Sequence, residues 1–433
     1  MYLLYNLLLL LSGLFLVPFY QFHGWRHGKS HRGIRERLGA YTVEQKQRLQ
    51  EAQVIWIHAV SVGETRAAIP LISALRRSYP DHLILVTSVT ETGHAIAMEN
   101  SQVDLCLFFP FDFSWTVRKV LRLINPAIVI IVETEIWPNF CRQAKGLNIP
   151  LVLINGRISD RSYPRYRLVR VFLAPLLESF CAFCMQSQTD VERIIALGAP
   201  PQRVENSGNL KFDRQLQIAT TEEVLRKKSV YRLPQDAAIM VAGSTRSGEE
   251  RLLVEAYRKI ADRIDRPLLL VLIPRHPERC REVQGLLKDM GASYRLRSLL
   301  TPNDQLLAAG EILIGDTLGE VMTLYSVADL VFVGGSLVPI GGHNLLEAAL
   351  VGKPVLFGPY MENFKEISAK LVRAGAGLQV QDGSDLERQS IILLNDPARC
   401  RAMGEAGQVL IKENAGAVER TMAEIDQCLV ARA

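Results

Sequence analysis

The stretch Val54-Ile-Trp-Ile-His-Ala-Val-Ser-Val-Gly-Glu-Thr65 decides the fold class, because it runs from an apolar segment through a turn into a helical pattern. Residues 54–58 have the length and composition of a buried strand. Ser61 and Gly63 suit a tight turn, and the apolar residues from Ala67 to Leu75 are spaced as on one face of a helix. The stretch therefore predicts a strand followed by a helix, the unit of parallel sheets covered by helices.

The same alternation continues along the chain in two sets. The first set of strand candidates is Val54–His58, Leu83–Thr87, Ala127–Val132 and Pro150–Ile154; the second is Ala237–Ala242, Pro267–Ile273, Glu311–Ile314, Asp329–Val333 and Pro354–Phe357. We therefore expect an α/β protein with two Rossmann-like, doubly wound domains that face a cleft. The expected domains are 46–212 and 237–405, joined by a polar linker over 213–236 and followed by a C-terminal helix over 406–433.

The N-terminal end has the pattern of a membrane anchor. Residues 1–22 contain nine leucines and no charged side chain, and a spanning helix needs about 20 residues. A basic juxtamembrane segment follows over 23–45. Its residues 23–37 contain five Lys and Arg and one Glu, a local net charge of +4. Because positive flanks stay in the cytoplasm, we expect a single anchor with the main body on the cytoplasmic side. A helix lying in the membrane plane is the alternative, and a cleaved signal peptide fits poorly.

The composition excludes several classes of protein. A hydrophobic fraction of 48% and a charged fraction of 22% exclude a disordered chain and a polytopic transporter. The net charge is +5, and only +1 (5 − 4) of it lies outside the basic segment, so no nucleic-acid-binding surface is expected. The seven cysteines are scattered and odd in number, as reduced core thiols are. No cluster of residue types with metal-ligand spacing is present, and we expect no metal.

Carboxylates follow two of the predicted strands in the first half. Glu64 lies at a strand-to-helix turn, where a carboxylate can act as a general base or can simply favour the positive end of the helix dipole. Glu133 and Glu135 follow the apolar run that ends at Val132, and such surroundings favour hydrogen bonding or a raised pKa.

The second half has the features of a nucleotide site. Arg275 lies between two prolines after a strand and offers a fixed cation to a phosphate. The glycine-rich stretches Gly315–Glu320 and Gly334–Glu347 let the backbone approach a ligand, and a helix start after each would offer amides to an anion. A P-loop ATPase is excluded by the absence of its motif, and a Rossmann dehydrogenase fits badly because no GxGxxG follows the first strand of either half.

Together these motifs resemble the lipopolysaccharide Kdo (3-deoxy-D-manno-octulosonic acid) transferase family. The resemblance covers essentially the whole chain. It includes the apolar N-terminus with its basic flank and the following motifs: Ser61-Val-Gly-Glu-Thr65, Glu133-Thr-Glu-Ile-Trp-Pro138, Gly208-Asn-Leu-Lys-Phe-Asp213, Pro274-Arg-His-Pro277, Gly315-Asp-Thr-Leu-Gly-Glu320, Gly334-Gly-Ser336 and Gly341-Gly-His-Asn-Leu-Leu-Glu347.

The resemblance implies a GT-B glycosyltransferase of lipopolysaccharide biosynthesis at the inner membrane. It implies inverting transfer of Kdo from CMP-Kdo to a lipid A precursor, with no cofactor or metal. Glu64 is then the catalytic base, and Glu133 and Lys211 support the transition state. With that acceptor, the basic segment that contains Arg157 and Arg161 suits the acceptor phosphates, or it is a solvated helix. The residues it places at CMP are Pro274, Arg275, Leu318, Gly319, Glu320, Asn344, Leu345, Leu346 and Glu347.

Three alternatives compete with this interpretation. A GT-B enzyme could use a UDP-sugar in place of CMP-Kdo. Nucleotide-sugar 2-epimerases share the two-domain plan, although the apolar N-terminus argues against a soluble epimerase. A membrane-tethered module that binds nucleotide without catalysis would leave Glu64 idle.

Overall fold

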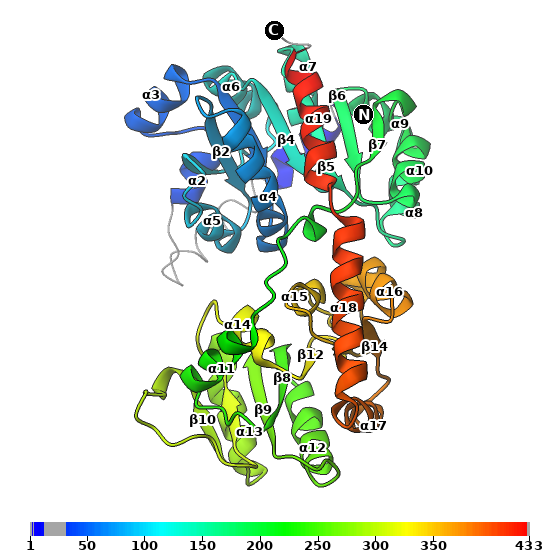
Figure 1. Cartoon of the computed structure of the whole chain (residues 1–433). Coiled ribbons are helices and arrows are strands. Elements are labelled where there is room, and N and C mark those ends of the chain that lie inside the picture. Colours follow the sequence, from blue (N-terminus) through cyan, green and yellow to red (C-terminus); the bar gives the residue numbers. More distant parts are fainter. Residues whose placement is uncertain (1, 3, 13–31, 431–433) are drawn as a thin grey trace. The chain divides into compact units, whose positions relative to one another are not determined.

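The computed structural model describes residues 2, 4–12 and 32–430 of the chain (Figure 1). They form two compact units, and each is described by itself. The first unit takes in residues 1–213 and 414–433, and the second takes in residues 214–413.

The first unit is built on a parallel sheet with the strand order β3-β2-β1-β4-β5-β6-β7. Its strands are β1 (Val54–His58), β2 (Leu83–Ser88), β3 (Leu105–Phe108), β4 (Ile128–Val132), β5 (Leu151–Gly156), β6 (Phe180–Met185) and β7 (Val204–Asn206). β1 pairs with β2 on one side and with β4 on the other, so the strand order reverses between β1 and β4. Open parallel sheets bind their ligands at the carboxyl edge of such a reversal.

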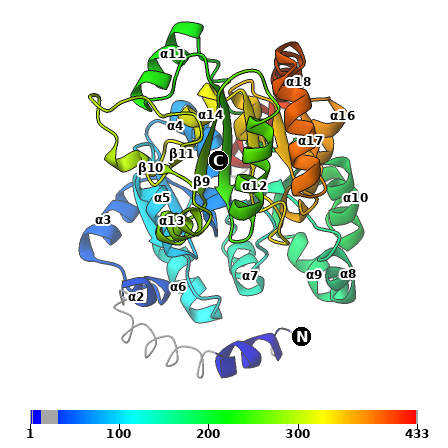
Figure 2. The same ribbon diagram turned by 90° about the horizontal axis from the view of Figure 1, so that it is seen from below.

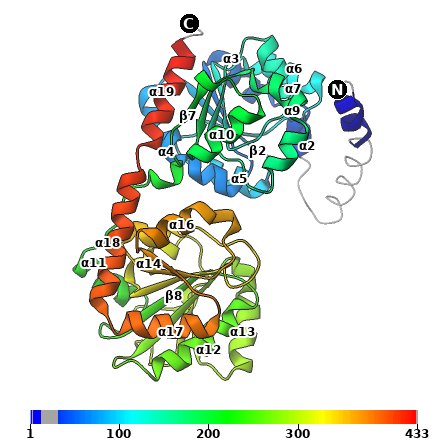
Figure 3. The same ribbon diagram turned by 90° about the vertical axis from the view of Figure 1, so that its right-hand side faces the viewer.

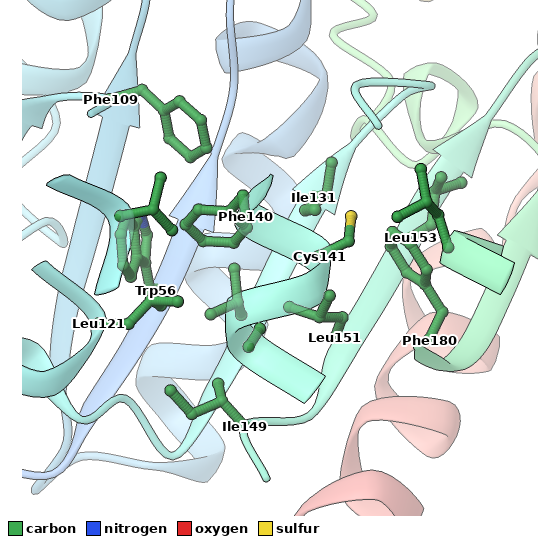
Figure 4. Close-up of a cluster of buried hydrophobic side chains, with 14 of the residues drawn as sticks. Trp56, Phe109, Leu121, Ile131, Phe140, Cys141, Ile149, Leu151, Leu153 and Phe180 are labelled. Atoms are coloured by element: carbon green, nitrogen blue, oxygen red, sulfur yellow. The ribbon is translucent and has the colours of Figure 1, made fainter. Parts of the chain in front are cut away.

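Helices cover both faces of this sheet. One face packs against α3 (Val43–Glu51), α6 (Ser114–Ile124), α7 (Pro138–Gly146), α9 (Arg170–Leu177) and α10 (Gln188–Leu197); the other packs against α4 (Val62–Ser78), α5 (Glu91–Met98) and α19 (Ala417–Val430). Figure 4 shows the first of these cores, where the Trp56 ring meets Phe140 edge-on at 5.3 Å. Because both faces are buried, the strands are continuous apolar runs, which is why the sequence reveals them.

The second unit repeats the plan with the strand order β10-β11-β9-β8-β12-β13-β14. Its strands are β8 (Ala238–Thr245), β9 (Leu268–Pro274), β10 (Tyr294–Leu296), β11 (Ile312–Ile314), β12 (Leu330–Val333), β13 (Val355–Phe357) and β14 (Gly377–Gln379). Its helices are α11 (Thr221–Val230), α12 (Glu249–Ala261), α13 (Cys280–Asp289), α14 (Val321–Val327), α15 (Leu346–Leu350), α16 (Lys365–Arg373), α17 (Gly383–Leu394) and α18 (Pro397–Asn414). The strand order reverses between β8 and β12. A second ligand-binding site is therefore expected at the carboxyl ends of these two strands.

The expected α/β class with two doubly wound sheets is confirmed, but three expected segments differ in detail. The segment 213–236, expected as a linker, contains α11 and contributes the buried Tyr231 and Leu233 to the second unit. The expected helix over 406–433 is two helices, α18 and α19 (Figure 3). The backbone turns between them at Gly416, which has a left-handed φ of +91°.

Part of the expected basic segment 23–45 is helical and contacts the first unit. Residues 32–37 form helix α2, and the Arg37 guanidinium donates a hydrogen bond to the Val89 carbonyl and lies over the Phe108 ring at 4.8 Å. Burial lowers the pKa of Arg37. Arg37 therefore packs against the first unit, whereas Arg35 is exposed; residues 23–31 of the expected basic segment lie outside the described residues.

The expected anchor over 1–22 is described only in part. Residues 4–12 are helical, and residues 13–22 lie outside the described residues. Within the described part of the chain, no helix is both long enough and apolar enough to cross a membrane.

Asp213 fastens the C-terminal helix to the first unit, and we predict that Asp213→Ala loosens it. The Asp213 carboxylate accepts hydrogen bonds from the backbone N–H groups of Gly416, at 2.6 Å, and Val418, as a capping side chain does. Loss of such a cap costs about 1 kcal/mol, which urea denaturation followed by circular dichroism measures. The exposed Gln427→Ala on the same helix should stay within about 0.5 kcal/mol of the parent chain, and equal values for both variants would contradict the capping role.

Candidate active site

Glu64 lies at the carboxyl edge of the first sheet, immediately beyond β1. Ser61 caps α4, which places Glu64 in the first turn of that helix with only 8% of its surface exposed. The Val60 N–H donates to Glu64 Oε2 at 2.6 Å, and the Ser61 hydroxyl donates to Oε1 at 2.9 Å. The carboxylate is thus held in one orientation by donors from its own turn.

The electrostatics of the edge make Glu64 more basic than an ordinary carboxylate. Burial raises the pKa of Glu64 to about 7, and the neighbouring Glu133 and Glu135 add to the rise. The pKa of Glu135 is itself raised by burial and by Glu133. Three carboxylates from two adjacent strand ends therefore share one region, as the sequence predicted for Glu64, Glu133 and Glu135 separately.

Glu133 follows β4 in a backbone conformation that is rare for a residue with a side chain. Its φ is +60°, in the left-handed region, while its N–H still donates to the Ile154 carbonyl at 2.9 Å. The turn directs the chain away from the sheet one residue after β4 ends. Lys211 Nζ lies 3.8 Å from Glu133 Oε1, so the structure brings together the two residues that the resemblance paired.

A buried amide network that the sequence did not reveal holds Lys211 in place. Asn209 donates from Nδ2 to Gln186 Oε1 at 2.9 Å, and its Oδ1 accepts from the Lys211 N–H at 3.0 Å. Gln186 in turn donates to the Asn155 carbonyl at 2.8 Å, and Asn155 Oδ1 accepts from the Leu210 N–H at 3.1 Å. These amides fix the backbone that carries Lys211. The sequence does not reveal the network, because single Asn and Gln residues beside apolar segments form no recognisable motif.

The two arginines expected at the acceptor lie differently. Arg157 directly follows β5, and its backbone bonds to the Thr134 hydroxyl, which ties the ends of β4 and β5 together. Arg161 is exposed in the loop before α8 (Tyr163–Leu168). Arg157 therefore belongs to the same strand edge as Glu133, whereas Arg161 lies on the loop beyond it.

In the second unit, four basic side chains lie close enough to interact electrostatically at the edge formed by β8 and β9. They are Arg246, Arg275, His276 and His343. The Arg275 N–H donates to the Thr245 carbonyl at 3.0 Å, which fixes the start of its loop. Arg246 Nε donates to His343 Nε2 at 3.3 Å. Burial lowers the pKa of His343 to about 4, and Arg275, Arg246 and His276 lower it further. A cluster of this kind suits an anionic ligand.

The loop after β12 is held by a buried carboxylate that the sequence analysis missed. Glu249 is 0% exposed and accepts four backbone N–H groups, from Gly335 at 2.7 Å and from Ser336, Leu337 and Arg246 at 2.9 Å. Gly335 has a φ of +68°, and a Cβ there would lie 2.9 Å from the His343 ring. Glu249 thus joins the loop of Arg246 to the glycine loop on which His343 packs.

The remaining residues predicted at the nucleotide are distributed over two loops. The expected helix starts are short: α14 begins at Val321 and has seven residues, and α15 begins at Leu346 and has five. Leu318 is 83% exposed, whereas the side chains of Leu345 and Leu346 are buried, so these two can meet a ligand only through their backbone. Glu320 already accepts from Arg297 and Tyr231, at 3.0 and 3.1 Å, and Glu347 lies 4.0 Å from Arg214.

A cavity of about 590 Å³ in the first unit lies away from these residues. It is lined by residues that precede β1, β2 and β4, among them Gln53, His82 and Asn125. The amino ends of the strands therefore form its wall, and the carboxyl edge with Glu64 lies at the opposite end of the sheet.

The raised pKa of Glu64 makes this residue a source of instability at neutral pH. A carboxyl whose folded pKa lies above its unfolded value stabilises the fold at low pH, and this contribution is lost as pH rises from about 4.5 to about 7. We predict that Glu64→Gln is more stable than the parent chain at pH 8, by about 2–3 kcal/mol, and that the difference vanishes near pH 4. Urea denaturation at both pH values measures it.

The exposed Glu192→Gln on α10 is the matched control, and its stability relative to the parent chain should not change between the two pH values. A Glu64→Gln variant that is less stable than the parent at pH 8 would show that the carboxylate is needed for the fold.

Solved structures resemble the chain in fold. A glycosyltransferase from Rickettsia africae matches with a TM-score of 0.59 and 14% identity, over 88% of this chain and 100% of that chain. The UDP-GlcNAc 2-epimerase from Neisseria meningitidis matches with a TM-score of 0.58 and 12% identity, over 87% of this chain and 100% of that chain. The fold is therefore GT-B, and the fold alone does not separate a transferase from an epimerase.

Proteins related in sequence distinguish between a transferase and an epimerase. Residues 32–214 match the family described as 3-deoxy-D-manno-octulosonic-acid transferase (kdotransferase). The 3-deoxy-D-manno-octulosonic acid transferase of Haemophilus influenzae is 35% identical over 86% of this chain and 86% of its own. The enzymes of the same name from Bordetella pertussis and Chlamydophila psittaci are 34% and 30% identical, over 87% and 96% of this chain and 88% and 94% of their own. With such agreement along both lengths, this chain belongs to the 3-deoxy-D-manno-octulosonic acid transferase family of glycosyltransferases.

Proposed function

We propose that this protein transfers Kdo from CMP-Kdo to a lipid A precursor in lipopolysaccharide core biosynthesis, with inversion at the anomeric carbon. The reaction takes place at the cytoplasmic face of the inner membrane, where residues 1–22 anchor the chain. The observation that carries the proposal is the buried Glu64, whose pKa of about 7 suits a general base at neutral pH.

Glu64 accepts the proton of the attacking hydroxyl. The acceptor oxygen forms a bond to the anomeric carbon of Kdo while the bond from that carbon to the phosphate oxygen breaks, and CMP leaves with the electron pair. The donors from Val60 and Ser61 hold both carboxylate oxygens, so the base is oriented before the acceptor arrives. Glu133 supports this role by raising the proton affinity of Glu64.

Lys211 supplies positive charge beside the reacting centre. It lies 3.8 Å from Glu133 and is held by the network of Asn209, Gln186 and Asn155. A cation there offsets the negative charge of the sugar carboxylate or of the phosphate as the transition state forms. Arg157 and Arg161 are the proposed contacts to acceptor phosphates, through charge-assisted hydrogen bonds.

The second unit holds the donor. Arg275 and its neighbours offset the charge that grows on the CMP phosphate, because fixed cations stabilise a leaving anion more than they stabilise the bound donor. The proposed CMP contacts are Pro274, Arg275, Leu318, Gly319, Glu320, Asn344, Leu345, Leu346 and Glu347, of which Leu345 and Leu346 act through their backbone.

The decisive experiment offers the purified chain CMP-Kdo or UDP-sugars, each with a lipid A precursor, and weighs the products. Addition of Kdo from CMP-Kdo, and no addition from a UDP-sugar, supports the proposal. Transfer from a UDP-sugar would favour the other GT-B reaction, and conversion of UDP-GlcNAc without an acceptor would favour the epimerase.

We predict that Glu64→Gln slows transfer by about 10²- to 10⁴-fold, because the amide keeps the shape of the side chain but accepts no proton. The affinity for CMP should stay unchanged, since the proposed CMP contacts lie in the other unit. Single-turnover rates and calorimetric CMP titration measure the two quantities, with Glu192→Gln as the control. Near-normal turnover would transfer the role of base to Glu133 or Glu135.

We predict that Arg275→Ala weakens use of the donor by about 2–4 kcal/mol in kcat/KM for CMP-Kdo, as loss of a desolvated charge pair does. Arg275→Lys should restore part of this loss, because it keeps the charge but loses the guanidinium fork. The exposed Arg281→Ala on α13 is the control. A response to CMP-Kdo concentration that matches the parent chain would remove Arg275 from the donor site.

A further inference from the structure

The N-terminal helix has two faces with different surroundings. Tyr2, Tyr5, Asn6 and Leu9 are spaced on one side of the helix and are partly buried. Leu4, Leu7, Leu8 and Leu11 follow the same spacing on the opposite side and are 47–59% exposed. We call the second set the leucine row. A helix that is apolar on its outer side and polar or aromatic on its inner side has the pattern of one that lies on a surface.

The inner face is bonded to the first unit. The Tyr5 hydroxyl donates to Asp112 Oδ2 at 2.8 Å, and Asn139 Nδ2 donates to Asn6 Oδ1 at 2.7 Å. Asp112 is 4% exposed and also accepts from the N–H groups of Asn139 and Phe140, which begin α7. The partners of the helix are therefore themselves part of the folded core.

Aromatic contacts complete the docked face. The rings of Tyr2 and Tyr5 lie 5.1 and 6.1 Å from the ring of Phe172 in α9, and the Arg142 guanidinium lies 5.2 Å from the Tyr2 ring. Figures 2 and 3 both place the helix beside α7 and α9, along the outside of that layer.

This docking is incompatible with residues 2 and 4–12 being the first half of a transmembrane helix. A spanning helix has to leave the protein and enter hydrocarbon, which would break the hydrogen bond of Tyr5 to Asp112 and that of Asn139 to Asn6 and would separate the tyrosine rings from Phe172. The apolar sequence that remains, residues 13–22, is ten residues long, about half of what a span requires.

The surroundings of the helix suit an anionic membrane surface. The helices α6 and α7 and the segment 161–177 carry nine exposed Lys and Arg and no Asp or Glu, while Asp160 and Glu178 flank the segment and Glu178 lies 3.6 Å from Lys145. The whole chain has a net charge of +5, so the rest of it sums to −4 (5 − 9). Exposed apolar side chains lie among these cations: Leu168 is 88%, Val171 84% and Trp115 59% exposed.

We propose that residues 2 and 4–12 form an in-plane anchor, docked on α7 and α9, that presents the leucine row and the surrounding cations to an anionic lipid bilayer. The chain then lies on one leaflet and does not span it. This inference rests on the proposed function in one respect: the lipid acceptor of the proposed reaction requires a membrane next to the protein. It places the carboxyl edge with Glu64 next to the same surface, because α6 and α7 begin at that edge.

The orientation of the helix is tested with fluorescent labels on the full chain bound to vesicles of phosphatidylethanolamine and phosphatidylglycerol. Leu4→Cys and Leu11→Cys carry the label at two points of the leucine row, and lipid-attached quenchers report its depth. Equal depths are expected. A spanning helix would separate the two labels by about 10 Å in depth, since seven residues rise about 1.5 Å each, and this result would overturn the proposal. A label at Gln427→Cys should stay unquenched, and the labelled parent chain gives the background of native cysteines.

The lipid preference is tested by cosedimentation with the same vesicles and with phosphatidylcholine vesicles. Arg165→Glu with Arg167→Glu should weaken binding to the anionic vesicles at least about tenfold, and Leu7→Glu with Leu8→Glu should weaken binding to both. The matched control, Arg399→Glu with Arg401→Glu on α18, should bind as the parent does. Binding that ignores lipid charge, or self-association without vesicle binding, would overturn the proposal.

These readouts are independent of the proposed reaction. A chain that fails to use CMP-Kdo would still give equal label depths if the anchor lies in plane. A chain that uses CMP-Kdo but gives depths 10 Å apart would retain its proposed function and lose the in-plane anchor.

Discussion

The parallel pairing of β1 with β4 is the constraint on which the candidate site depends. His58 lies opposite Ile131 in this pairing, so the two strands end together at one edge. The chain leaves β1 toward one face of the sheet, into α4, and leaves β4 toward the other, into α7. Because α4 and α7 depart toward opposite faces, the strand ends that carry Glu64 and Glu133 lie next to each other at this edge.

Two residues at the same edge have unfavourable backbone conformations. Glu133 after β4 and Asn155 at the end of β5 both have left-handed φ angles, of +60° and +51°, which cost free energy in residues with side chains. Hydrogen bonds from elsewhere hold them: Glu133 donates to Ile154, and Asn155 bonds to Gln186 and Leu210. The edge is therefore rigid because distant segments converge on it.

This convergence explains what the sequence could predict. Buried parallel strands are continuous apolar runs, so Val54–His58 and the class of fold were predictable, and Glu64 stood out because it follows a strand and a turn. Asn209, Gln186 and Glu249 were not, because each bonds to a group 23 or more residues away: Asn209 to the Gln186 side chain, Gln186 to the Asn155 carbonyl and Glu249 to the Gly335 N–H. The strands β7, β10 and β14 have three residues each and are partly exposed, so they lack the apolar run that reveals the equally short but buried β11 and β13. The docking of the N-terminal helix depends on Asp112 and Asn139, which no periodicity reveals.

A comparison of Glu64 with Glu249 shows why burial alone does not define a base. Burial raises the pKa of both carboxyls. Four backbone N–H groups point at Glu249 and favour its charged form, so its oxygens are fully occupied as acceptors. Glu64 receives two donors and faces two other carboxylates, which favour its protonated form. The first arrangement fastens two loops together, whereas the second leaves a carboxylate that gains and loses a proton near neutral pH. The number of donors and the sign of the neighbouring charges therefore distinguish the structural residue from the proposed catalytic one.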